Sequence, residues 1–221
     1  MLKGLFDRAK AAGRHAALSP QPLIFEQEVM DLFLRYRPGP RPNDKYAASN
    51  PKQPWSSQPA LQDAIHTQLG ICIDRFASPL DVHNPNLHFW SKHDRDTAFS
   101  AHTDAYSCRW QGYSYAFPGT DTTETEKATK WALWSAMQST EPTATLLAIP
   151  RSRTAKGRPV YLSWVDQYPK FCTTLTTIPF SDAPLHTQDI WWCSGTQGEQ
   201  ASKWDLMLVL ISNLSAQADL R

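Results

Sequence analysis

The sequence predicts an α/β fold in which helices cover both faces of a sheet. From about residue 60 to residue 214, short apolar segments alternate with segments of helical pattern, which is typical of strands joined by crossover helices. The length of 221 residues is enough to bury a full domain core and leave an extension. Seventeen prolines favour many short elements over long regular ones.

Residues 1–39 predict an N-terminal helical extension. The segment from Met1 to Ala17 has a basic amphipathic pattern with a single acid, Asp7. Its candidate roles are docking on RNA or on a partner, a mitochondrial targeting segment, and a plain exposed helix. A second helix is expected from about Leu23 to Tyr36, where a wide apolar stripe ends at Pro38-Gly39-Pro40.

Residues 40–59 contain Pro, Asn, Ser, Lys and Gln with few apolar residues, and they predict a Pro-rich linker that runs over the domain surface. The main domain is expected to span residues 60–214, with residues 215–221 as a tail. It begins with a helix from Pro59 to Leu69, for which Gly70 provides the exit.

The remaining predicted elements alternate in type along the domain. In order they are a strand at Ile71–Ile73, a helix at Thr123–Ser139, a strand at Thr143–Ile149, a helix at Leu162–Tyr168, and strands at Cys172–Ile178, Ile190–Cys193 and Leu206–Ile211. In such sheets a ligand lies at the carboxyl ends of the strands. We therefore expect Phe76–Leu80 and Tyr115–Gly119, which both follow strand candidates, to face one cleft.

Charge and cysteine usage narrow the functional classes. With 22 Lys and Arg against 21 Asp and Glu, the net charge of +1 gives no global attraction to nucleic acid, so such a contact would be local. The four cysteines form no C-x-x-C pair, which predicts reduced, buried thiols. The sequence contains no apolar stretch of membrane-spanning length, and we expect an intracellular protein without a membrane partner.

A series of short motifs runs through the domain in a fixed order. They are Arg75-Phe76-Ala77-Ser78-Pro79-Leu80-Asp81, Phe89-Trp90-Ser91, Asp94-Arg95-Asp96, Phe99-Ser100 and Gly112-Tyr113-Ser114-Tyr115-Ala116. In order and spacing they resemble the phosphorylated-CTD-interacting-factor family of cap-adenosine N6-methyltransferases, over residues 60–214. The resemblance implies a Rossmann-like class I methyltransferase sheet.

The catalytic tetrapeptide of that family is altered in this chain. The family carries Asn-Pro-Pro-Phe after an alanine, and the Asn oxygen accepts a hydrogen of the adenine amine while the aromatic ring stacks on the base. Here Ala116 is followed by Phe117, Pro118, Gly119 and Thr120. A phenyl ring cannot accept that hydrogen bond, and loss of one oriented bond costs on the order of 10² to 10³ in rate. The resemblance therefore implies a methyltransferase fold without catalysis.

Two other interpretations of this segment stay open. In a shifted alignment Asp121 supplies the acceptor, and the chain is then an active S-adenosylmethionine-dependent adenine-N6 methyltransferase acting on RNA or DNA. Pro118-Gly119 also suits a type II turn without any chemistry, which is compatible with either function.

The resemblance also implies where the methyl donor would bind. The candidate residues are Ala77, Ser78, Pro79, Leu80, Asp81, Phe99 and Ser100. Asp81 stands where the family has Asn, and Ser100 stands where it has Gly, so that a side chain now crowds the approach to the backbone. We therefore expect no cofactor unless the chain is active, in which case the cofactor is S-adenosylmethionine.

The sequence contains further candidate sites. Four cations without an acid, Arg151, Arg153, Lys156 and Arg158, predict a loop that contacts phosphates, with a solvated loop as the alternative. The spacing of His88, His93 and His102 matches no zinc pattern, so no metal is expected. Gly112–Ala116 matches the G-x-S-x-G nucleophile elbow of hydrolases except at its last residue.

The tryptophans are spread over the predicted elements and are expected in core or interface packing rather than in a base-stacking platform. Those considered are Trp131, Trp134, Trp164, Trp191, Trp192 and Trp204.

Three functional hypotheses remain at this point. The first is a non-catalytic methyltransferase-fold protein that is a structural or RNA-contacting component of a larger assembly, such as a ribonucleoprotein, with protein partners. The second is the active methyltransferase, and the third is a partner-binding module that acts through the N-terminal helices alone.

Overall fold

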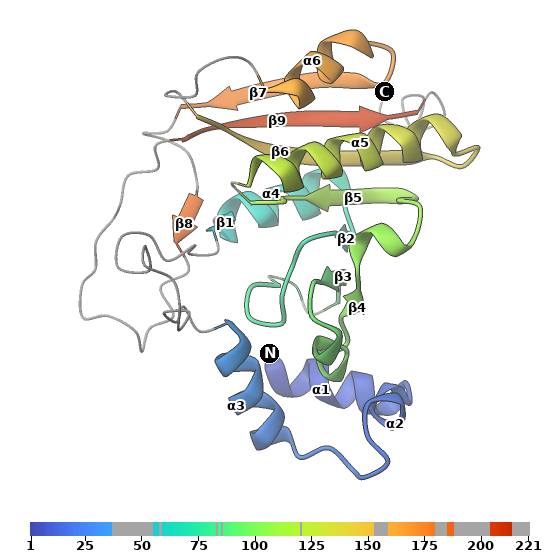
Figure 1. Ribbon diagram of the computed structural model, residues 1–221, viewed down its shortest axis with the longest axis vertical. Coiled ribbons are helices and arrows are strands. Elements are labelled where there is room, and N and C mark those ends of the chain that lie inside the picture. Colours follow the sequence, from blue (N-terminus) through green and yellow to red (C-terminus); the bar gives the residue numbers. More distant parts are fainter. Residues whose placement is uncertain are drawn as a thin grey trace.

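The centre of the protein is a seven-stranded mixed sheet with the strand order β4-β3-β2-β5-β6-β9-β7 (Figure 1). The computed structural model describes residues 1–36, 55–57, 59–82, 84, 86–119, 121–152, 159–179, 185–187 and 204–213. The strands are β2 (Ile73–Asp74), β3 (His88–Ser91), β4 (His102–Thr103), β5 (Gly112–Ala116), β6 (Thr143–Ser152), β7 (Cys172–Ile178) and β9 (Trp204–Ser212). The predicted Rossmann-like α/β class is confirmed at this level.

Strand direction changes only at one side of this sheet. The neighbours from β4 to β6 are all parallel. β9 is antiparallel to both β6 and β7, so β7 again has the direction of β6. The chain therefore builds outward from β2 to β4, returns to β5 on the other side of β2, and finishes by inserting its last strand between β6 and β7.

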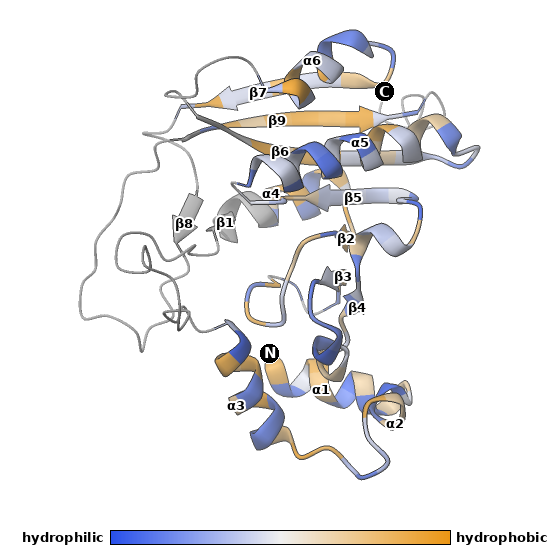
Figure 2. Ribbon diagram, viewed as in Figure 1, coloured by the Kyte–Doolittle hydropathy of each residue, from blue (hydrophilic) through white to orange (hydrophobic). Residues whose placement is uncertain are grey.

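Helices cover both faces of the sheet, and β6 shows how the sequence achieves this. Leu147 and Ile149 pack with α5 (Thr122–Gln138) and α6 (Val160–Gln167). Leu146 and Ala148 point to the other face, where they pack with Ile65 of α4 (Pro59–Leu69). Because successive side chains of a strand alternate between faces, a strand buried on both sides must be apolar throughout. The hydropathy of β9 fits the same rule (Figure 2).

The long elements agree closely with the sequence prediction. α4 and β7 have the predicted bounds, α5 and α6 differ by one or two residues at their ends, and Gly70 follows α4 in a left-handed conformation with φ of 63°. The short strands β3 and β4 were not predicted, because two to four residues carry too little periodicity. The predicted strand Ile190–Cys193 lies outside the described residues.

Part of the predicted linker is itself a strand. β1 (Trp55–Ser57) pairs antiparallel with β8 (Leu185–Thr187), with Trp55 opposite Thr187. This end of the segment 40–59 is thus attached to a distant part of the chain, and residues 40–54 lie outside the described residues.

Three N-terminal helices pack at the β4 side of the sheet (Figure 1): α1 (Leu2–Ala11), α2 (Arg14–Leu18) and α3 (Phe25–Tyr36). Leu5, Phe6 and Leu32 form one buried cluster with Phe89 of β3 and with Phe99. The interpretation of the first segment as a plain exposed helix is therefore wrong, since Leu5 is fully buried. This packing accounts for its amphipathic pattern without a targeting role.

The N-terminal helices cover a part of the sheet where the described crossover segments contain no α-helix. Parallel strands are normally joined by helices that shield the sheet. The described residues between β2 and β3 contain no α-helix, and β3 and β4 are joined by a 3-10 helix, η1 (Asp94–Phe99). The Phe89 face of β3 is consequently covered by α1 and α3.

We expect Leu32→Ala to lower the free energy of unfolding by about 2–5 kcal/mol, because it leaves a cavity between α3 and the sheet edge. Leu34→Ala is the same change on the same helix at a residue that is 59% exposed, and it should change stability by less than about 0.5 kcal/mol. Urea unfolding followed by tryptophan fluorescence measures both variants. Equal effects would contradict the docking of α3.

Candidate functional site

The candidate site lies at the carboxyl edge of the parallel strands, next to the point where strand order reverses between β2 and β5. Segment 75–82 follows β2, and Phe117–Gly119 follows β5. The two strands are parallel neighbours, and the Arg75 N–H donates to the Tyr115 carbonyl over 2.9 Å. Both predicted motifs thus start from adjacent strand ends, where ligands bind in sheets of this kind.

In the first predicted donor-binding segment, the polar groups form hydrogen bonds within the segment. Asp81 Oδ1 accepts from the backbone N–H of Ser78 and, over 2.8 Å, from the Ser78 hydroxyl. The Ser78 hydroxyl oxygen accepts from the Leu80 N–H over 3.2 Å. The hydroxyl and the carboxylate of this segment are therefore used to hold its own turn, with Ala77 and Pro79 buried beside them.

The second predicted donor-binding segment, the Phe99-Ser100 turn, is covered by the N-terminal helices. Phe99 is fully buried, and its ring centroid lies 5.9 Å from that of Phe6. The Ser100 hydroxyl donates to the Leu5 carbonyl over 2.8 Å, and Arg14 Nη1 donates to the Ser100 carbonyl over 3.0 Å. α1 and α2 therefore occupy the surface of this turn.

Ser100 keeps the backbone conformation that a glycine would adopt there. Its φ of 67° is in the left-handed region, which is uncommon for residues with a Cβ. The hydrogen bond from its hydroxyl to α1 needs a side chain that glycine lacks. A side chain at this position thus serves the docking of α1.

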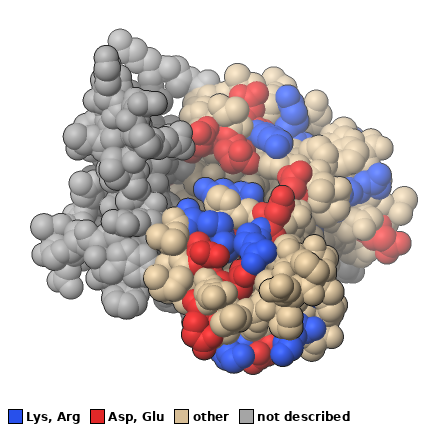
Figure 3. Space-filling view, turned by 60° about the horizontal axis from the view of Figure 1, so that its bottom comes forward, with Lys and Arg blue, Asp and Glu red and all other residues tan. Residues whose placement is uncertain are grey.

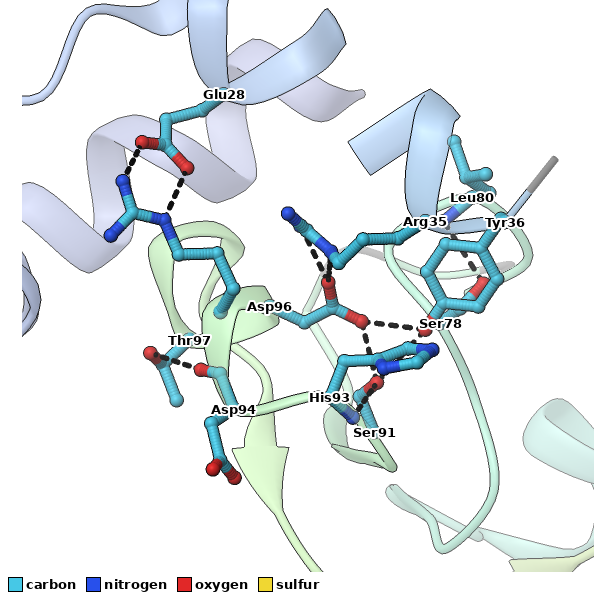
Figure 4. A network of polar contacts seen from close by, with 11 residues as sticks. Glu28, Arg35, Tyr36, Ser78, Leu80, Ser91, His93, Asp94, Asp96 and Thr97 are labelled. Carbon is cyan, nitrogen blue, oxygen red and sulfur yellow. Dashed lines mark hydrogen bonds and ion pairs between the residues drawn. The ribbon is translucent and has the colours of Figure 1, made fainter. Parts of the chain in front are cut away.

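A buried carboxylate, Asp96, joins α3 to the sheet edge (Figure 4). It is fully buried and its Oδ1 accepts from Arg35 Nη2 at 2.8 Å. Its Oδ2 accepts from the Tyr36 hydroxyl at 2.6 Å and from the Ser91 hydroxyl at 2.5 Å. Burial and the neighbouring carboxylate raise the pKa of Tyr36, so this phenol remains a donor. A buried charge is tolerated when it is paired and hydrogen-bonded, as here.

A second ion pair fixes the same helix two turns earlier. Glu28 of α3 is buried and accepts from Arg95 Nε at 3.0 Å, with a second contact from Arg95 Nη2 to the other carboxylate oxygen. Glu28 and Arg35 are seven residues apart and so lie on one face of α3. The acidic motif at residues 94–96 is thereby used for docking, a role that its sequence did not indicate.

Phe117, which the resemblance places at the acceptor position, is part of the core. It is 8% exposed and packs in the cluster of Ile65 and Ile71 on the α4 face. Gly119 has φ of 81°, as expected for the second central residue of a type II turn after Pro118. Ala116 is also buried, in the cluster on the α5 face.

Asp121, the alternative acceptor, caps α5. Its Oδ1 accepts from the backbone N–H groups of Thr123 at 2.8 Å and Glu124 at 3.3 Å. Aspartate is among the preferred residues at this position because it satisfies free N–H groups of the first turn. The carboxylate thus has a structural use independent of any substrate.

Asp74, which sequence reasoning missed, is the buried last residue of β2. Its Oδ1 accepts from the Phe76 N–H over 3.0 Å. Burial raises the pKa of its carboxyl to about 7. A single acid at the end of an apolar strand, beside the point of strand reversal, was the available signal.

The remaining candidates do not converge on this edge. The His93 ring contacts Tyr36, whereas His102 stacks on Trp90 with ring centroids 4.5 Å apart. Within the part of the chain that the structure describes, no group of three or more His, Cys, Asp or Glu side chains is placed to hold a metal. Ser114 of the hydrolase-like motif is fully buried within β5, 3.0 Å from the Thr145 hydroxyl, and so is not in an exposed turn.

Two further expectations have mixed outcomes. Cys172 is buried, as predicted, and its burial raises the pKa of its thiol to about 12. Cys72 is exposed, so the prediction of buried thiols is wrong for this residue.

In the predicted basic cluster, Arg151 lies in β6 opposite Asp205 of β9. Arg153, Lys156 and Arg158 lie outside the described residues.

Among the described helices, none is long and apolar enough to cross a membrane.

Comparison with known proteins adds no assignment, since no protein-family model and no curated protein matches this chain.

We expect Asp96→Asn to lower the free energy of unfolding by about 3 kcal/mol or more, because Arg35 then loses its charged partner in a buried network. Asp94→Asn removes the same charge from an exposed residue of η1 and should cost less than about 0.5 kcal/mol. Chemical denaturation of both variants measures the difference. A small effect of Asp96→Asn would show that this carboxylate does not hold α3.

The pKa of Asp74 predicts a pH dependence of stability. Because its folded pKa of about 7 is above the ordinary aspartate pKa of 3.8, the folded state holds a proton that the unfolded state releases. Asp74 therefore destabilises the fold as pH rises from about 4 to about 7, at about 1.4 kcal/mol per unit of pKa difference. Relative to Asp74→Asn, the wild type should lose stability over this range, as measured by denaturation at several pH values. A constant difference between the two proteins would contradict the raised pKa, and Asp94→Asn serves as the control.

Proposed function

We propose that this chain is a non-catalytic protein with a methyltransferase fold, which serves as a structural or RNA-contacting component of a larger assembly. The strand order supports the fold part of the proposal. The seven-stranded order, with the antiparallel β9 between β6 and β7, is compatible with the Rossmann-like sheet that the motif resemblance implies.

The burial of Phe117 is the observation that carries the loss of catalysis. Methyl transfer to an adenine amine requires an oxygen that accepts its hydrogens at the carboxyl edge of β5. Position 117 instead holds a phenyl ring that is 8% exposed and packed toward α4. Asp121 is engaged by two backbone N–H groups of α5. Without an oriented acceptor, a rate loss on the order of 10² to 10³ is expected at the chemical step alone.

The state of the donor-binding segments supports the same proposal. The Phe99-Ser100 turn is covered by α1 and α2, and Ser78 is bonded to Asp81 within its own turn. A ligand at these places would have to displace hydrogen bonds and buried apolar surface that stabilise the fold. We therefore propose that S-adenosylmethionine is not bound.

A structural component of an assembly binds its partners through its surface and does not need a reactive site. Basic and acidic side chains are interspersed on the face that Figure 3 shows, so this face offers no broad field of one sign to a polyanion. Contacts with RNA would then be confined to local groups of cations, of which the predicted cluster Arg151–Arg158 is one, and the other contacts would be with proteins.

Calorimetric titration of the full chain with S-adenosylmethionine tests this proposal. We expect no saturable heat of binding, because the donor segments are occupied by the protein's own contacts. An adenine-containing RNA incubated with labelled donor should gain no label above the background without protein. Saturable binding together with methyl transfer would replace the proposal with the active adenine-N6 methyltransferase.

A further inference from the structure

Three aromatic rings lie in contact beside α5, and a fourth ring lies on α6. Tyr106 belongs to the 3-10 helix η2 (Ala105–Ser107), Trp131 and Trp134 to α5, and Trp164 to α6. The Tyr106 and Trp131 ring centroids are 5.7 Å apart, and those of Trp131 and Trp134 are 4.9 Å apart. Trp134 is 42% exposed. We call these four rings the aromatic stripe.

Three exposed cations accompany the stripe, each over one ring. Lys127 Nζ lies 3.7 Å from the Tyr106 centroid and Lys130 Nζ lies 5.1 Å from that of Trp164. The Arg109 guanidinium lies 5.3 Å from the Trp134 centroid. Lys127, Lys130 and Trp134 are three and four residues apart, so α5 presents them on one face.

The three cations of this surface form no ion pair with a carboxylate within the part of the chain that the structure describes. Two acids, Glu124 and Glu126, lie on the same helix, and Glu124 accepts a hydrogen bond from the Tyr106 hydroxyl. The cations therefore have no carboxylate partner, although acids lie near them and the whole chain carries a net charge of only +1.

An exposed tryptophan, Trp134, beside unpaired cations complements one kind of partner. Bases of a single strand stack on aromatic rings, and its phosphates contact Lys and Arg. Protein interfaces are rich in Trp and Tyr but depleted of Lys, and two of the three cations here are lysines. From this combination we infer that the aromatic stripe, with Arg109, Lys127 and Lys130, is a binding surface for single-stranded nucleic acid.

This surface goes beyond the proposed function, because it does not use the carboxyl edge of the sheet or the predicted cluster Arg151–Arg158. The donor titration and the nucleic-acid titration can therefore fail independently. Trp131 and Trp164 pack against the core cluster, as the sequence predicted for most of the tryptophans, whereas Trp134 is exposed.

Fluorescence anisotropy of a labelled oligouridine, titrated with the full chain at several salt concentrations, tests the inference. Trp134→Ala should weaken binding by about 10- to 100-fold, because stacking contributes about 1–3 kcal/mol per base. Trp134→Phe keeps a ring and should retain most of the affinity. Met30→Ala, which shortens an exposed side chain on α3, should leave it unchanged.

The contribution of Lys127 and Lys130 is measured by the salt dependence of the affinity. Replacement of both Lys127 and Lys130 by alanine should lower the slope of log affinity against log salt by about 1.4, at about 0.7 per phosphate of a single strand. Replacement of Lys10 and Lys92, which are exposed on other elements, removes the same charge and should leave the slope unchanged.

Four results would overturn the inference. They are the absence of saturable binding at low salt, equal effects of the two lysine pairs, equal losses for Trp134→Phe and Trp134→Ala, and displacement of oligouridine by polyglutamate of matched charge as effectively as by unlabelled oligouridine. The last result would mean that a protein-like polyanion fits the surface and that bases are not recognised. Circular dichroism of each variant confirms that it is folded.

Discussion

The buried carboxylate of Asp96 is the contact on which one half of the structure depends. It lies on η1, accepts from the Ser91 hydroxyl at the end of β3, and accepts from Arg35 and Tyr36 at the end of α3. A buried charge costs free energy unless hydrogen-bond donors surround it. The donors come from α3 and β3 and the carboxylate from η1, so these three elements must assemble together. The pair of Glu28 and Arg95 then sets the orientation of α3.

This contact is needed because the sheet edge from β2 to β4 lacks crossover α-helices among the described residues. α1 and α3 supply the missing apolar cover through Leu5, Phe6 and Leu32. The same docking brings α1 and Arg14 onto the Ser100 turn, where the resemblance places the methyl donor. Stability of the fold and coverage of that turn therefore come from one set of contacts.

The carboxyl edge of the sheet and the surface beside α5 use their side chains differently. At the carboxyl edge, Phe117 packs in the core and Asp121 caps α5. Beside α5, Trp134 and the cations Arg109, Lys127 and Lys130 are exposed. The first arrangement supports the proposal of a non-catalytic chain, and the second is the surface inferred to bind single-stranded nucleic acid.

The sequence by itself determined the long local elements. Periodicity and end signals located α4, α5 and β7, and Gly70 and Asp121 act within a few residues of the helices that they bound. Tertiary structure decided the strand order, the presence of β3 and β4, the burial of α1 and the network of Asp96. The physical reason is that these features depend on contacts between residues far apart in the sequence; Asp96 and Arg35, for example, are 61 residues apart. The free-energy cost of burying the Asp96 carboxylate is offset by partners distant in the sequence, and such partners leave no periodic pattern in the sequence. Only the assembled fold therefore shows which acid is paired and which is exposed.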